Sequence, residues 1–186
     1  MISLSMPPSV LLSPVTPSPN SSSWHTARTG LSPTPQQPCT PTEIVPRLYI
    51  SDLASAESAA SLRAHGITHV LSAMCGRVIL PPDVPIKQLQ LPLQDSPFAE
   101  LAEFLPTSTA FVANALRDPN ARVLVHCVQG VSRSSSVVCA YLIAEYGWTP
   151  DRALQFLLSK YSQAEPNPGF IMQLNEYARS LQGSVQ

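Results

Sequence analysis

The stretch RVLVHCVQGVSRSSSVVCAYLIAEYG, residues 122–147, combines two strongly apolar segments with a short polar loop. Its first part, 122–127, is rich in valine and leucine and predicts a buried central strand. Its last part, 133–147, is apolar on nearly every side and predicts a buried helix. A strand, a short loop and a helix in this order are typical of parallel sheets, so the stretch favours an α/β fold.

The sequence on both sides of this stretch alternates in the same way. We expect strands at 43–51, 67–73 and 86–93, and helices at 55–66, 101–118, 151–161 and 168–181. Gly66 is suited to end the first helix, and Thr149 followed by Pro150 is suited to begin the helix at 151–161. The predicted fold is therefore α/β, with a mostly parallel central sheet flanked by helices.

The loop between the predicted strand and helix has the features of an anion site. A loop at this place lies at a helix N-terminus, where the first backbone N–H groups have no partner within the helix. Gly130 gives the backbone the freedom to curl, and Arg133 adds a forked donor for phosphate oxygens. The residues expected to bind a phosphate are Val128, Gln129, Gly130, Val131, Ser132 and Arg133.

Cys127 ends the predicted strand and therefore lies in the same positive field. A helix N-terminus and a neighbouring cation favour the thiolate form of a cysteine, which is a nucleophile at neutral pH. Ser134 can donate a further hydrogen bond to the sulfur. A cysteine in such a place is most often a small buried apolar residue. A core, however, needs no arginine and no serine pair beside it, so we interpret Cys127 as a nucleophile.

The string HCVQGVSRS, 126–134, resembles the HCxxGxSRS signature of the cysteine-dependent protein phosphatases, specifically of the dual-specificity group. The resemblance covers about residues 43–182 and includes RLYIS, LRAHGITHVLSA, LPLQDSP, AYLIAEYGWTPDRAL and EPNPGFIMQL. It implies a small, atypical dual-specificity phosphatase with its catalytic domain at 43–183. Such an enzyme dephosphorylates phosphotyrosine and phosphoserine or phosphothreonine in proteins, and it uses neither a metal nor another cofactor.

The resemblance also implies roles for individual residues. Cys127 attacks phosphorus and carries a cysteinyl phosphate, and Arg133 binds the phosphoryl oxygens. Ser134 stabilises the thiolate when it leaves in the second step. Asp95 protonates the leaving oxygen and then deprotonates the attacking water. By its local sequence alone, Asp95 before Ser-Pro is equally an ordinary turn residue.

Three further residues have a structural alternative beside the implied role. His126 orients the loop in the family, and it is equally well described as a satisfied buried histidine. Asn167 braces the surroundings of the site, or it makes only local loop hydrogen bonds. Cys75 follows the strand at 67–73 and is a candidate redox partner that traps oxidised Cys127 as a disulfide. Its alternative is a plain loop cysteine.

The composition limits the partners. The net charge is −1, so no strong field favours nucleic acid, and no apolar run has the roughly 18–20 residues of a membrane span. We expect a phosphoprotein substrate, no nucleic acid and no membrane anchor. The four cysteines do not resemble a disulfide framework. This indicates a reducing compartment, the cytoplasm, with the nucleus as an additional location.

The first 42 residues differ from the rest of the chain. They hold 9 of its 20 prolines and many serines and threonines, and they contain no Asp or Glu. Such a segment has too little apolar surface to offset its ordering entropy, so we expect a disordered Pro/Ser/Thr-rich tail at 1–42. Its six Ser/Thr-Pro pairs suggest a proline-directed kinase as a partner. Alternatively, a tail of this composition contains such pairs by chance.

Other functions remain open at this point. The same chemistry can act on a non-protein phosphate, such as a phosphoinositide, a phosphorylated glucan or an RNA 5′ end. The low positive charge argues mildly against the phosphoinositide and the RNA. A phosphoprotein-binding module with little turnover is a second alternative. A rhodanese-type sulfur transferase also has a cysteine in a loop before a helix, but the signature and Asp95 favour phosphoryl transfer.

Overall fold

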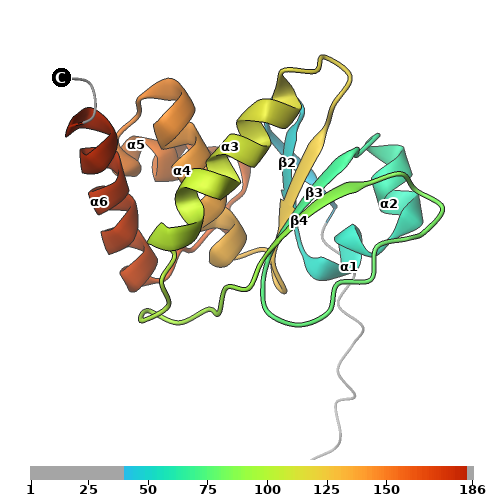
Figure 1. The fold of residues 1–186 in the computed structure, drawn as a ribbon, viewed down its shortest axis with the longest axis horizontal. Coiled ribbons are helices and arrows are strands. Elements are labelled where there is room, and N and C mark those ends of the chain that lie inside the picture. The colour runs from blue at the N-terminus through green and yellow to red at the C-terminus, as the bar shows by residue number, and fades with distance from the viewer. Residues whose placement is uncertain (1–39, 184–186) are drawn as a thin grey trace, which may run out of the picture. The chain divides into compact units, whose positions relative to one another are not determined.

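The structure is a computed structural model of the chain and describes residues 40–183. This part forms one five-stranded sheet in the order β1-β2-β5-β3-β4 (Figure 1). The strands are β1 (Thr42–Val45), β2 (Leu48–Ser51), β3 (His69–Ala73), β4 (Lys87–Leu91) and β5 (Val123–His126). Only β1 is antiparallel to its neighbour, while β2, β5, β3 and β4 run parallel. The prediction of a mostly parallel α/β sheet is confirmed.

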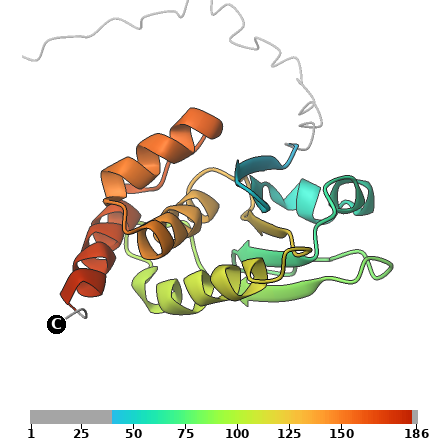
Figure 2. The same ribbon diagram turned by 90° about the horizontal axis from the view of Figure 1, so that it is seen from above.

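Helices cover both faces of the sheet (Figures 1 and 2). Two short helices lie on one side, and the longer helices lie on the other. The short pair is α1 (Leu53–Ala56) and α2 (Ala59–Ala64). The longer set is α3 (Leu105–Leu116), α4 (Arg133–Tyr146), α5 (Pro150–Lys160) and α6 (Pro168–Gly183), with a 3₁₀ turn, η1 (Ala102–Phe104), before α3. The central helix α4 is buried along most of its length, as its composition predicts.

The apolar run of β5 is explained by burial on both faces. Val123 and Val125 belong to the larger core under α3–α6, whereas Leu124 packs into the smaller core on the other face. All three side chains are fully buried. Successive strand residues point to opposite faces, so a strand covered on both sides reads as a continuous apolar run. This burial fixes the strand that delivers the loop after it.

The predicted helix ends are also found. Gly147 ends α4 in the left-handed region with φ 64°, and Gly66 lies just beyond α2 with φ 61°. The Thr149 hydroxyl accepts a hydrogen bond from the Arg152 N–H, and Pro150 is the first residue of α5.

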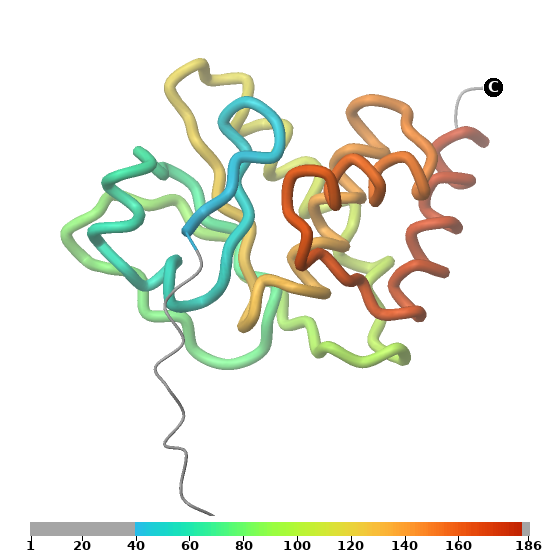
Figure 3. Tube along the Cα trace, turned by 180° about the vertical axis from the view of Figure 1, so that it is seen from behind, coloured from blue at the N-terminus to red at the C-terminus, as the bar shows by residue number. Residues whose placement is uncertain are grey.

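Two predicted elements are divided in the structure. The strand expected at 43–51 is two antiparallel strands, because the chain turns at Pro46 and Arg47 (Figure 3). Arg47 has φ 70° there, and its guanidinium donates to carbonyl groups at the end of α3. The helix expected at 55–66 is α1 followed by α2. The division falls at Ser58, whose hydroxyl accepts from the Ser61 N–H and begins a new helix.

The sequence makes one prediction about an N-terminal tail and one about membrane spans. Nearly all of the predicted tail at 1–42, including most of its Ser/Thr-Pro pairs, lies outside the described residues. Within residues 40–183, none of the helices has the length and apolar character needed to cross a membrane.

Candidate active site

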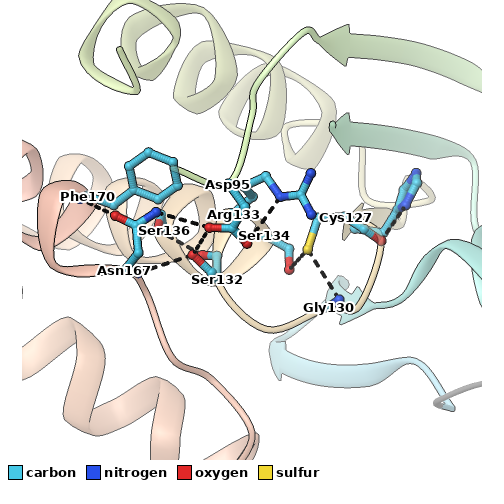
Figure 4. Close-up of polar contacts among 10 residues, drawn as sticks. Asp95, Cys127, Gly130, Ser132, Arg133, Ser134, Ser136, Asn167 and Phe170 are labelled. Atoms are coloured by element: carbon cyan, nitrogen blue, oxygen red, sulfur yellow. Dashed lines mark hydrogen bonds and ion pairs between the residues drawn. The ribbon is translucent and has the colours of Figure 1, made fainter. Parts of the chain in front are cut away.

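The loop of residues 127–132 lies at the carboxyl edge of the parallel strands. β5 ends at His126, Cys127 follows, and α4 begins at Arg133 (Figure 4). This is the edge where open α/β sheets bind ligands, and the first N–H groups of α4 face it. The structure therefore places the loop where the sequence predicts it, between a central strand and a buried helix.

Gly130 has two reasons to be glycine. Its φ of 75° is in the left-handed region, which side chains other than glycine rarely adopt. A Cβ added here would lie 2.6 Å from the Tyr161 hydroxyl and 2.8 Å from the carbonyl oxygen of Ser51. The tight curl of the loop against β2 and Tyr161 therefore requires a residue without a side chain.

Hydrogen bonds from neighbouring segments orient two carbonyl groups of the loop toward its outside. The Leu53 N–H donates to the Val128 carbonyl at 3.3 Å, and the Glu165 N–H donates to the Val131 carbonyl at 3.0 Å. Across a trans peptide, the next N–H points opposite to the carbonyl. The amide groups after Val128 and Val131 therefore turn to the inside of the loop, as an anion-binding nest requires. The side chains of Val128 and Gln129 are exposed at the rim.

The Cys127 sulfur is buried and accepts hydrogen bonds inside the loop. The residue is 1% exposed. The Gly130 N–H donates to Sγ at 3.2 Å, and the Ser134 hydroxyl lies 3.3 Å from Sγ (Figure 4). Donors aimed at the sulfur stabilise its anion, and the N-terminus of α4 acts in the same direction. The geometry suits a thiolate nucleophile.

Arg133 is placed for an anionic ligand. Its side chain is only 12% exposed, and Nε lies 3.4 Å from Oδ2 of Asp95. Nε has no hydrogen-bond partner among residues 40–183. A buried guanidinium N–H without a hydrogen bond is costly, so a bound phosphoryl oxygen would satisfy it.

Asp95 reaches this site from the segment between β4 and η1. Its Oδ1 accepts from the Ser132 hydroxyl at 2.7 Å and from Nδ2 of Asn167 at 3.0 Å (Figure 4). Its Oδ2 faces Arg133. The structure therefore brings the candidate acid beside the phosphate loop, which the local sequence alone does not indicate.

Asn167 connects Asp95, the loop and α6. Its N–H donates to the Ser132 hydroxyl at 3.1 Å, and its Oδ1 accepts from the Phe170 N–H at 3.0 Å. It therefore caps α6 at the same time as it binds Asp95. The bracing role of Asn167 stays a prediction, and the direct bond to Asp95 and the joining position of Ser132 were not predicted. An asparagine before a proline at a helix start is an N-cap signal, which indicates the bond from the Phe170 N–H but not the contacts with Asp95 and Ser132.

His126 lies behind the loop in a buried position. Burial lowers its pKa to about 4, so the imidazole is neutral near pH 7. Nδ1 lies 3.3 Å from the Cys127 carbonyl oxygen and Nε2 lies 2.7 Å from the Ser72 hydroxyl. Since a carbonyl only accepts, Nδ1–H donates to it and Nε2 accepts from Ser72. Ser72 was not predicted, although it lies on the strand next to β5.

Two other cysteines of the described chain, Cys75 and Cys139, differ in their surroundings. Cys75 is exposed after β3, Cys139 is buried in α4, and the thiols of Cys75, Cys127 and Cys139 are free. Burial raises the pKa of Cys139 to about 12, which fits a core residue.

In the part of the chain that the structure describes, no three His, Cys, Asp or Glu side chains gather as a metal site would need.

Comparison with protein families gives a match over most of the chain. The family described as "Dual specificity phosphatase, catalytic domain" matches residues 48–180. The match begins with β2 and ends within α6, so it includes Asp95, the loop after β5 and Asn167.

Relatives of known description are phosphatases. The "Tyrosine-protein phosphatase yvh1" of Schizosaccharomyces pombe is 39% identical over 136 residues, 73% of this chain, and the chain spans 40% of that protein. The "Dual specificity protein phosphatase 1B" of Arabidopsis thaliana is 34% identical over 77% of this chain and 84% of the relative. The "Dual specificity protein phosphatase 26" of Mus musculus is 34% identical over 77% of this chain and 70% of the relative.

Solved structures share the fold. A mouse protein described as a dual specificity phosphatase, complexed with zinc tungstate, has TM-score 0.74 and 32% identity. The overlap covers 83% of this chain and 96% of that one. The human "tyrosine phosphatase-like serine/threonine/tyrosine-interacting protein" has TM-score 0.70 and 28% identity, over 76% of this chain and 97% of that one.

Proposed function

The chain belongs to the dual-specificity phosphatase family, and on that premise we propose how its site works. The proposed enzyme removes phosphate from phosphotyrosine and from phosphoserine or phosphothreonine in proteins. It needs no metal and forms a cysteinyl phosphate on Cys127. One observation carries the proposal: the buried Cys127 sulfur, the Arg133 guanidinium and the Asp95 carboxyl lie in one site at the N-terminus of α4.

In the first step the Cys127 thiolate attacks phosphorus. The S–P bond forms as the P–O bond to the leaving alkoxide or phenoxide breaks. Protonated Asp95 gives its proton to that oxygen, which makes it a better leaving group. The two hydrogen bonds to Oδ1 leave Oδ2 as the oxygen that carries the proton.

In the second step water attacks the phosphocysteine. Asp95, now a carboxylate, takes a proton from the water, and the S–P bond breaks to release inorganic phosphate. The electron pair returns to sulfur. The hydroxyl of Ser134 and the N–H of Gly130 stabilise the returning thiolate, because both lie within hydrogen-bond reach of Sγ.

Arg133 binds the phosphoryl group in both steps. Its Nε has no hydrogen bond within the described chain and lies beside Asp95. When a phosphoryl group enters, its anionic oxygens replace the Asp95 carboxylate as the partner of the guanidinium. Preorganised donors of this kind stabilise the transition state electrostatically.

The charge of the loop supports a protein substrate over a multiply phosphorylated small molecule. Residues 127–134 contain one cation, Arg133, and the exposed side chains of Val128 and Gln129 are uncharged. A phosphoinositide or an RNA 5′ end carries several phosphates and would require a more basic rim. We therefore keep non-protein phosphates as the alternative substrate class.

A binding module with little turnover is the second alternative. One structural relative is described as a phosphatase-like interacting protein, which makes the alternative concrete. Cys127, Arg133 and Asp95 are all present at one site, with Oδ2 of Asp95 3.4 Å from Nε of Arg133, and this favours turnover here. A proline-directed kinase acting on residues 1–42 and a cytoplasmic or nuclear location stay predictions from the sequence.

The function is tested by hydrolysis of p-nitrophenyl phosphate and of phosphotyrosine and phosphothreonine peptides in excess EDTA. Cys127→Ser is expected to abolish turnover. Asp95→Asn is expected to reduce kcat about 10²-fold or more, because general acid catalysis is worth about 10²–10⁴. Asp151→Asn, an exposed carboxylate in the first turn of α5, is the matched control and is expected to leave kcat unchanged. Peptide binding without turnover by the folded wild-type chain would favour the binding module.

A further inference from the structure

The segment that carries Asp95 lacks regular secondary structure. It runs from the end of β4 at Leu91 to the start of η1 at Ala102. A segment outside helices and strands moves unless other contacts fix it. A general acid, however, must lie within hydrogen-bond distance of the leaving oxygen. The position of Asp95 therefore depends on what holds the residues after it.

Gln173 of α6 holds this segment with both atoms of its side-chain amide. Its Nε2 donates to the Ala99 carbonyl at 2.8 Å, and its Oε1 accepts from the Ala102 N–H at 2.8 Å. One amide therefore joins two backbone groups three residues apart. Only an amide of this length supplies a donor and an acceptor at the same place, since Glu has no donor and Met has neither.

Two other residues of α6 and its cap contact the same segment. Asn167 donates to Asp95, and Gly169 packs so closely on Pro97 that an added Cβ would lie 2.7 Å from the Pro97 Cα. Three contacts with α6 and its N-cap therefore fix the segment at Asp95, Pro97 and Ala99. Figures 1 and 3 show the segment beside the N-terminal end of α6.

Gln173 has little to do with the core. Its side chain is half-buried, whereas Phe170, Leu174 and Ala178 are the buried α6 residues that pack into the core. A hydrogen bond near the surface contributes modestly to folding stability. The two bonds of Gln173 are therefore better explained by what they position than by what they stabilise.

We propose that Gln173 is a positioning residue for the general acid: its two hydrogen bonds keep the Asp95 segment in place before the substrate binds. This inference rests on the proposed phosphatase function. Without the clamp, the segment samples positions in which Asp95 is too far from the leaving oxygen. The first step, formation of the cysteinyl phosphate, then slows only where the leaving group needs a proton, because binding by the loop and Arg133 is unaffected.

The test compares Gln173→Met with wild type on two substrates. Phenyl phosphate has a poor leaving group, and 2,4-dinitrophenyl phosphate has one that leaves without a proton. We compare kcat/KM, which reports the steps up to the cysteinyl phosphate and leaves out the second step, in which Asp95 acts as the base for both substrates. We expect kcat/KM on phenyl phosphate to fall about tenfold, a part of the about 10²–10⁴ that a general acid contributes, and kcat/KM on the dinitrophenyl ester to stay within about twofold. Asn175→Leu is the control, since the Asn175 amide bonds only within α6, to the Ile171 carbonyl.

A double mutant separates positioning from other effects. In an Asp95→Asn background, Gln173→Met is expected to cause no further loss, because both changes remove the same contribution. Gln173→Glu keeps the acceptor for Ala102 and loses the donor for Ala99, so we expect a smaller, equally selective loss. This variant serves if Gln173→Met does not fold.

Three outcomes would overturn the inference. Equal losses of kcat/KM on both substrates, additive losses with Asp95→Asn, or an unchanged kcat/KM on phenyl phosphate would each do so while wild-type turnover remains. Absence of turnover by the folded wild-type chain on either substrate would instead contradict the proposed function itself, and the positioning role with it.

Discussion

Gly169→Ala should disable the acid while leaving the nucleophile intact. Gly169 is the second residue of α6 and packs on Pro97, two residues after Asp95. An added Cβ would lie 2.6 Å from the Pro97 carbonyl carbon and 2.7 Å from its Cα, with the carbonyl oxygen closer still. Real Cβ atoms essentially never come within 3.0 Å of such atoms. Pro97 must therefore move.

The size of the movement sets the expected effect. To restore ordinary contacts of at least 3.4 Å, Pro97 must retreat by about 1 Å or more, and we expect Asp95, two residues before it, to move with it. A misplacement of about 1 Å can cost about 10²-fold in rate. We therefore expect kcat on phenyl phosphate to fall about 10²-fold. Alanine is a better helix former than glycine by about 1 kcal/mol, so the helix itself offers no reason for a loss.

The assay is steady-state hydrolysis of phenyl phosphate and 2,4-dinitrophenyl phosphate, with thermal unfolding as the check on folding. Gly183→Ala is the matched control, because it makes the same change in α6 where nothing lies within 4 Å. It should leave kcat unchanged. Wild-type activity in a folded Gly169→Ala variant would refute the claim that this contact fixes the acid segment.

Three further predictions concern other residues of the site. The pKa of His126 is lowered from 6.5 to about 4, so between these pH values only the unfolded chain takes up this proton. The free energy of unfolding, measured with urea, should therefore fall by about 2 kcal/mol from pH 7 to pH 4.5. His126→Gln should lack this part of the fall. Ser134→Ala should slow the second step, so that pre-steady-state kinetics with an activated aryl phosphate show a larger burst than in wild type; an unchanged burst would argue against this role. Mild peroxide decides between the two alternatives for Cys75: a Cys75–Cys127 link in peptide mass spectrometry would identify the redox partner, and absence of the link would make Cys75 a plain loop cysteine.

The stretch at 122–147 predicts much of the fold because its signals are local. The apolar run of β5, the special residues of the loop and the apolar helix α4 all lie within one continuous segment. Burial on both faces of the sheet leaves a direct trace in the sequence. The division of the predicted strand at 43–51 leaves less trace, because it depends on Arg47 bonding to the end of α3, far along the chain.

The site was predictable to the extent that its residues belong to the signature. Cys127, Arg133 and Ser134 follow from that string. The contact between Asp95 and Ser132, separated by 37 positions, depends on how the β4–η1 segment folds back. Gln173 and Ser72 act through backbone groups or through another side chain, and no local pattern indicates such partners. Sequence reasoning therefore names the reacting groups more readily than the residues that place them.

The most direct test of the account is to look for the covalent intermediate. The chain is mixed with a ³²P-labelled phosphotyrosine peptide, quenched in acid within milliseconds and digested, and the labelled peptide is identified. A cysteinyl-phosphate mechanism gives label on the peptide that contains Cys127 and none in Cys127→Ser. Rapid turnover without covalent label, or label on a different residue, would contradict it.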